Sequence, residues 1–227
     1  MPATIKNLHK VSRKLIYEDV LSILRAAILE GAFEIGEHLV ETDIAEQLET
    51  SRVPVREAFK ELAREKLIEL HPFKGAVVAS FAATDIHEIY TLRGLLEGFA
   101  ARLVAKQATL DELAQLQEIH DEIEILIEKN DLGPVPQKDF EFHREICRLS
   151  GNERLLEIWD ALASQVRLVI AMADEIFLET YSILEVHRPV MEALINRDPV
   201  GAEEAMAINL RKVAQMVARA LEDRDTG

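Results

Sequence analysis

Several polar residues in the C-terminal half of the chain interrupt the apolar stripes of expected helices, and their types suit metal coordination. Asp139 and His143 are four residues apart in a helix expected over 135–149, so they share one helix face. His187 and Asn209 interrupt the stripes of two later helices. Carboxylate and imidazole groups are common ligands of divalent first-row metals. These positions therefore predict a polar site inside a helical bundle.

Arg93 adds a cation to this set, because it lies in the middle of the apolar stripe of an earlier helix. A buried charge needs a partner, and an arginine is suited to bind the carboxylate of a small ligand. The alternative is that each polar residue is satisfied separately in the core, for example by an Arg93–Asp139 ion pair. For the whole set we favour one shared pocket.

A second chemically distinctive group, Ser51, Arg52 and Arg56, begins a short helix in the N-terminal half. A helix N-terminus disfavours cations, and Arg52, Arg56, Lys60 and Arg64 follow at steps of four on one face. No acid lies three or four residues from Arg56 to offset this charge. The arrangement predicts an external anion such as DNA, whose phosphates and guanines arginine can bind. The alternative is a helical hairpin with a solvated basic face.

The elements around these arginines predict a winged helix–turn–helix. One helix is expected over 17–30 and ends at Gly31, and residues 32–39 are expected to form a loop. A short helix over 42–48, with Thr42 as its N-cap, is followed by a break and by the helix that carries Arg52. Two strand-like runs and the turn between them complete the wing, over residues 67–71, 72–75 and 76–79.

The rest of the chain is expected to be helical, because strand-type runs are scarce and aromatic residues make up only 5%. Thr84 and Thr109 are expected N-caps. His120 falls on an apolar stripe and is expected in the core or at the rim of the pocket. Six helices are predicted, over residues 85–107, 110–129, 135–149, 153–176, 180–196 and 199–222.

The charge of the chain is unevenly distributed. The formal net charge is −15 over 227 residues, but residues 1–80 hold 11 Lys and Arg against 13 Asp and Glu and are therefore close to neutral. Phosphate contact requires local positive charge rather than a positive average. The absence of an apolar run of 18 residues or a signal-peptide core predicts a cytoplasmic protein with no membrane span. The single Cys147 fits a reducing compartment.

The N-terminal part resembles the DNA-binding domain of GntR-family transcription regulators. At lower identity, the rest resembles the FCD domain (FadR C-terminal domain) of the same family, in its six-helix VanR-like type. The first resemblance covers residues 24–78 and rests on LRAAILEGAFEIGEHLVETDIAEQL, SRVPVREAFKEL and KGAVV. The second rests on LRGLLEGFAARLVA, DFEFHREICRLSGNERL and VHRPVMEAL.

This resemblance implies a mostly α-helical protein that is a transcription regulator, usually a repressor, and not an enzyme. A winged helix–turn–helix domain with a basic N-terminal arm (1–80) is followed by an all-helical bundle (81–227) that binds an effector and dimerises. The homodimer is expected to bind double-stranded operator DNA and to respond to a small organic acid held by Arg93 and Asn209. The expected DNA contacts are Thr42, Ser51, Arg52, Arg56, Lys74 and Gly75.

The FCD resemblance also implies a divalent metal, zinc or nickel, held by one Asp and three His. That set corresponds to Asp139, His143, His187 and the position of Asn209, where this chain has an amide instead of an imidazole. An amide oxygen is a weaker and harder ligand than an imidazole nitrogen. The site is therefore expected to bind the metal more weakly or lose it, to prefer a harder ion, to be completed by water, or to use Asn209 to hydrogen-bond the effector directly. Two alternatives are a metal-dependent enzyme with a helical-bundle active site and a regulator that responds to the metal itself.

Overall fold

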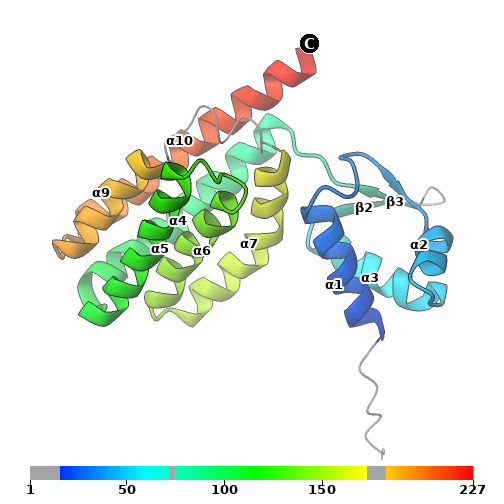
Figure 1. Cartoon of the computed structure of the whole chain (residues 1–227), viewed down its shortest axis with the longest axis horizontal. Helices are drawn as coiled ribbons and strands as arrows, with labels where there is room; N and C mark the ends of the chain where they lie inside the picture. The colour runs from blue at the N-terminus through cyan, green and yellow to red at the C-terminus, as the bar shows by residue number, and fades with distance from the viewer. Residues whose placement is uncertain (1–15, 72–74, 173–182, 227) are drawn as a thin grey trace, which may run out of the picture. The chain divides into compact units, whose positions relative to one another are not determined.

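The computed structural model describes residues 16–71, 75–172 and 183–226, which are mostly helical as the sequence predicts. The chain divides into two compact units (Figure 1). The first contains Met1–Arg64 and Ile68–Val78, and the second contains Glu65–Leu67 and Ala79–Gly227. Within the described ranges, no helix combines the length and the hydropathy needed to cross a membrane.

The first unit is a three-helix winged fold. Its small antiparallel sheet has the order β1-β3-β2, with Leu70 of β2 opposite Ala76 of β3. Strand β1 lies in a stretch that we expected to be a loop. It is only two residues long, and its partner comes from the wing almost forty positions later, so the local sequence carries no signal for it. The elements are α1 (Ile16–Leu29), β1 (His38–Leu39), α2 (Glu41–Gln47), α3 (Arg52–Arg64), β2 (Ile68–His71) and β3 (Gly75–Val78).

Helix α3 is oriented by its apolar stripe. The stripe is fully buried and packs on α1, which contributes a stripe of its own from the opposite side. Burial of this face leaves Ser51, Arg52 and Arg56 exposed at the start of α3. The buried residues are Val55, Ala58, Phe59 and Leu62 of α3 with Val20, Leu24 and Ile28 of α1.

Two predicted helix caps are wrong. Thr42 does not cap α2, because the helix begins one residue earlier with Val40 as its N-cap, and the Thr42 hydroxyl instead donates to Asp43. The earlier start places the Glu41 carboxylate in the first turn, where the helix dipole favours it. Thr84 does not cap the next long helix, which begins at Ala83. There, Asp85 accepts a hydrogen bond from the Ala82 N–H at 2.8 Å.

The described part of the second unit contains six helices, of which α4 (Ala83–Gln107) packs against four, α6, α7, α9 and α10. Thr109 caps α5 as predicted, in a capping box with Glu112. The bounds predicted for α6 are confirmed, whereas the predicted end at 176 and start at 180 lie outside the described residues. The other helices are α5 (Leu110–Glu128), α6 (Val135–Leu149), α7 (Glu153–Met172), α9 (Ile183–Ile195) and α10 (Pro199–Thr226).

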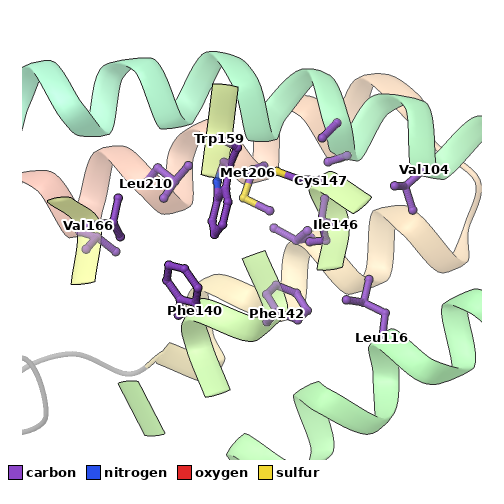
Figure 2. Close-up of a cluster of buried hydrophobic side chains, with 14 of the residues drawn as sticks. Val104, Leu116, Phe140, Phe142, Ile146, Cys147, Trp159, Val166, Met206 and Leu210 are labelled. Carbon is purple, nitrogen blue, oxygen red and sulfur yellow. The ribbon is translucent and has the colours of Figure 1, made fainter. Parts of the chain in front are cut away.

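The core of the second unit surrounds its polar residues with aromatic rings. Figure 2 shows Phe140, Phe142 and Trp159 inside the bundle, together with aliphatic side chains and Cys147. The ring centroids of Phe140 and Trp159 are 5.0 Å apart. Close packing of this kind holds neighbouring side chains in fixed rotamers. The polar groups described next are therefore held in place by a rigid apolar frame.

Candidate functional site

Asp139, His143 and His187 meet in the interior of the helical unit. The first two project from α6 one turn apart, and His187 comes from α9. One ligand atom from each of the three lies within 4.8 Å of the others. His187 Nε2 is 3.1 Å from Asp139 Oδ1, and His143 Nε2 is 3.8 Å from the same oxygen. We call these three residues the DHH cluster.

The imidazole rings of the DHH cluster are held by packing. Phe142, next to His143 on α6, stacks on the His187 ring with a centroid separation of 4.3 Å and an interplanar angle of 22°. The two histidine rings are 5.2 Å apart and nearly perpendicular. Their Nε2 atoms thus converge on one carboxylate from different directions. That arrangement suits a metal ion, which needs its ligands spread around it.

Glu97 on α4 organises this site, although it was not among the residues predicted from the sequence. Its side chain is fully buried, and its Oε2 lies 2.6 Å from His143 Nδ1. Its Oε1 accepts hydrogen bonds from Arg93 Nε and Trp159 Nε1, both at 2.7 Å. A carboxylate against Nδ1 places the proton there and leaves the Nε2 lone pair of His143 facing Asp139. Glu97 follows Arg93 by four residues, which is the signal that could have identified it.

Arg93 is buried as expected but has a different partner from the one we considered. It pairs with Glu97 on its own helix rather than with Asp139. Its guanidinium also lies 4.9 Å from the centre of the Tyr90 ring. Burial opposes the charge of Arg93, but the carboxylate of Glu97 outweighs this effect and raises the pKa. Arg93 therefore serves first to balance the charge of Glu97.

The electrostatics of the cluster favour the protonation states that a metal requires. Burial alone would raise the pKa of Asp139, but His143, His187 and Arg93 outweigh it and lower that pKa below its usual value. For His187 burial dominates and lowers the pKa, although Asp139 acts in the opposite direction. Burial likewise opposes the charge of Glu97, yet Arg93 and His143 lower its pKa to about 2. The carboxylates are therefore ionised and His187 is neutral near pH 7.

Asn209, the fourth expected ligand, lies on α10 next to the turn of α9 that carries His187. Its side chain is buried, and its Nδ2 donates to the backbone oxygen of Val186 at 3.5 Å, the limit of a hydrogen bond. Its Oδ1 has no partner in the described part of the chain. The donor set fits a divalent ion, because one ionised carboxylate and two imidazole nitrogens converge. An oxygen donor without a partner is also present on the adjoining helix.

The predicted DNA-contacting residues lie on the first unit, where an internal acid binds both arginines. Arg56 makes a two-point pair with Glu41 at 2.8 and 3.0 Å, and Arg52 bonds the same carboxylate at 3.2 Å. The hydrogen bond from Arg56 lowers the pKa of Glu41. Glu41, which comes from α2 and is not within four residues of either arginine, therefore partly offsets these charges. Contact with an external anion such as DNA stays a prediction. The guanidinium groups nevertheless remain half exposed.

Among the other predicted contacts, Thr42, Ser51 and Gly75 are exposed, and Lys74 lies outside the described residues. Gly75 begins β3 with φ of +89°, and a Cβ there would lie 3.4 Å from the Leu39 oxygen. A glycine is favoured in this conformation, which turns the chain at the base of the wing.

Comparisons with known protein families identify both units. Residues 16–78 match the family described as bacterial regulatory proteins, gntR family, and residues 88–212 match the FCD domain. A crystal structure of a GntR transcriptional regulator from Rhodococcus sp. RHA1 has 26% identity and a TM-score of 0.74. That match covers 89% of this chain and 97% of the other. A second structure, E. coli McbR/YncC, has 23% identity and a TM-score of 0.71 over 90% of this chain and 97% of its own, and shows the same fold.

Curated relatives carry repressor names. The "Probable D-xylose utilization operon transcriptional repressor" of Paenarthrobacter nicotinovorans is 34% identical, over 91% of this chain and 89% of its own length. The "Gluconate operon transcriptional repressor" of Bacillus licheniformis is 32% identical, over 77% of this chain and 74% of its own length.

Replacement of Glu97 with glutamine tests its organising role. The variant leaves Arg93 as an uncompensated buried charge and removes the acceptor at His143 Nδ1, so we expect about 3–5 kcal/mol lower free energy of unfolding. Denaturant titration measures this loss. The control is Glu157→Gln, which breaks an exposed pair with Arg154 and should cost less than about 1 kcal/mol. Equal losses in the two variants contradict the assignment.

Proposed function

We propose, because the chain belongs to the GntR family of bacterial transcription regulators and carries an FCD domain, that it represses an operon until a small hydroxycarboxylic acid binds in its helical unit. The chain is a DNA-binding regulator, and its relatives are named as operon repressors. In this proposal the first unit binds the operator, and the second unit binds the effector and forms a homodimer. Such a regulator acts in the cytoplasm, where the DNA is.

The DHH cluster is the observation that carries the effector part of the proposal. Asp139, His143 and His187 would hold a divalent ion, zinc or nickel being the first to test. Three protein ligands leave positions open, and the ion would there bind the carboxylate and an adjacent hydroxyl oxygen of the effector. One relative is named for a gluconate operon, and gluconate is a hydroxycarboxylate. Arg93 is paired with Glu97, so in this proposal the ion, rather than Arg93, supplies the positive charge that holds the anion.

The start of α3 supports the DNA-binding role. Arg52 and Arg56 are both exposed there, and Glu41 holds their guanidinium groups side by side before DNA is bound. An exposed ion pair contributes little free energy, so a phosphate or a guanine can replace Glu41 at small cost. Thr42 and Ser51 would add phosphate contacts, and Lys74 with Gly75 would bring the wing to the backbone.

An apolar stripe on α4 supports a homodimer. Leu92, Leu95 and Phe99 lie on one face of this helix and are 49%, 69% and 43% exposed. Large exposed apolar side chains in a row mark an interaction surface. A second copy is the partner that a two-half-site operator requires, because each winged unit reads one half-site. The opposite face of the same helix carries Arg93 and Glu97, so α4 connects the proposed effector site with the proposed dimer surface.

The DNA-contact assignment predicts that Arg52→Ala lowers affinity for an operator selected from random duplexes by about 10- to 100-fold, the effect of losing one base-contacting arginine. A mobility-shift titration measures it, with circular dichroism to confirm folding. The control is Arg64→Ala, at the other end of α3, where the side chain is 80% exposed and pairs with Glu61. Unchanged operator affinity in Arg52→Ala would remove this residue from the interface.

The effector proposal predicts that gluconate releases the operator from nickel- or zinc-loaded protein and that sorbitol, which lacks the carboxylate, does not. Removal of the ion with a chelator should abolish the response to gluconate while operator binding persists, because the ion supplies the contact to the carboxylate. Fluorescence anisotropy of labelled operator measures both effects. Operator release that persists after chelation would rule out a role for the ion. A lack of response to gluconate, citrate and lactate alike would rule out hydroxycarboxylic acids as the effector class.

The dimer proposal predicts that Leu95→Glu converts a homodimer into a monomer, since it places a charge in the centre of the apolar stripe. Native mass spectrometry gives the stoichiometry directly. Leu110→Glu is the matched control, because Leu110 is 78% exposed on α5, away from the stripe. If both variants remain dimeric, a different surface joins the subunits.

A further inference from the structure

His120 on α5 is a buried histidine without a hydrogen bond. The residue is 8% exposed, and neither ring nitrogen has a partner among the described residues. The nearest carboxylate oxygen, on Asp121, is 3.8 Å from Nδ1, which is too far for a hydrogen bond. Buried polar groups are almost always paired, and an unpaired one costs about 1–3 kcal/mol. A histidine kept in this state therefore indicates a missing partner.

The position of His120 indicates where that partner belongs. Helix α5 packs against α6 and α9, the two helices that carry the DHH cluster. The His120 ring centroid is 6.1 Å from that of His187 and 6.2 Å from that of Phe142. His120 is nevertheless not among the residues whose ligand atoms lie within 4.8 Å of one another. It is thus beside the cluster without being close enough to complete it.

Other unpartnered buried atoms come from helices around the same cluster. They are the Tyr90 hydroxyl on α4, Nδ1 of His187 on α9 and Oδ1 of Asn209 on α10. The described residues hold one further example, Arg167 on α7, whose guanidinium lies over the Phe140 ring. A bare ion at the DHH cluster would leave the nitrogens of His120 without a partner. A ligand with several oxygen atoms can supply one.

We propose that His120 contacts the effector, donating a ring N–H hydrogen bond to a carboxylate or hydroxyl oxygen of a ligand whose other oxygens lie at the DHH cluster. This inference rests on the proposed function and adds a specificity residue to it. The ion would hold the ligand by its chelating oxygens, and His120 selects a ligand long enough to place an acceptor on the α5 side. A buried water molecule at His120 is the competing occupant.

The test is His120→Phe, which keeps an aromatic ring against Phe142 and His187 but removes both nitrogens. Isothermal titration of nickel-loaded protein with gluconate should show affinity lower by about 10- to 100-fold, the effect of losing one hydrogen bond to a charged group. Titration of metal-free protein with Ni²⁺ alone should give an affinity within about threefold of the parent protein, because His120 does not ligate the ion.

Three variants control this experiment. His87→Phe makes the same substitution at an exposed position on α4 and should change neither affinity. His120→Gln keeps an N–H donor and should recover most of the gluconate affinity; it also provides the measurement if His120→Phe does not fold. Asn209→His adds an imidazole near His187 and should tighten Ni²⁺ binding, which shows that the metal titration detects a change in the ligand set.

The outcomes separate this contact from the function on which it rests. Equal gluconate affinity in His120→Phe and the parent protein overturns the contact and leaves water as the partner of His120. A loss of Ni²⁺ affinity above about 100-fold overturns it too, because His120 would then be a metal ligand. If the parent protein itself binds no hydroxycarboxylate when loaded with nickel, the effector proposal fails and the contact fails with it.

Discussion

The helical unit depends on one buried carboxylate, that of Glu97. It accepts hydrogen bonds from Arg93 on its own helix and Trp159 on α7, and it bonds His143 on α6. Removing an ion from water costs several kcal/mol, which only close and well-oriented partners offset. The observed packing of α4, α6 and α7 is the one that brings all three partners to Glu97, so these contacts favour it over packings that would leave the carboxylate unpaired.

This constraint also prepares the DHH cluster. Because Glu97 fixes the Nδ1 proton of His143, the Nε2 lone pair is directed toward Asp139 whether or not a ligand is present. The stacked Phe142 ring likewise holds the plane of the His187 ring in place. The site is thus arranged in advance, and little ordering entropy is lost when an ion or a ligand binds. The same α4 that carries Glu97 exposes Leu92, Leu95 and Phe99, so a shift at the site would reach the proposed dimer surface through one rigid element.

Sequence patterns predicted the features that depend on one helix. The stripe of α6 gave its bounds, and the four-residue spacing of Asp139 and His143 placed them on one buried face. Pairings between elements were not predicted. Glu41 is 15 residues from Arg56, and Glu97 is 46 residues from His143, so neither pair is visible in a local window. Of the three predicted threonine caps, Thr109 was confirmed, whereas Thr42 and Thr84 have the right residue type but the helices begin one residue before each of them. The lack of a hydrogen-bond partner at His120 among the described residues likewise becomes visible only once the packing of α5 against α6 and α9 is known.

The amide at position 209, where the FCD resemblance implies an imidazole, bears on how such a site could respond to a ligand. A third imidazole, as the fourth protein ligand, would saturate a tetrahedral ion and hold it tightly with no effector present. Asn209 offers an oxygen that has no partner, and it already donates weakly to the backbone of α9. A cluster of this kind is incomplete until another donor arrives. A ligand changes an equilibrium only by the difference in its affinity for two states. The difference in effector affinity between the two states can therefore be larger at a site that the effector itself completes than at a site whose ligands are already satisfied by the metal.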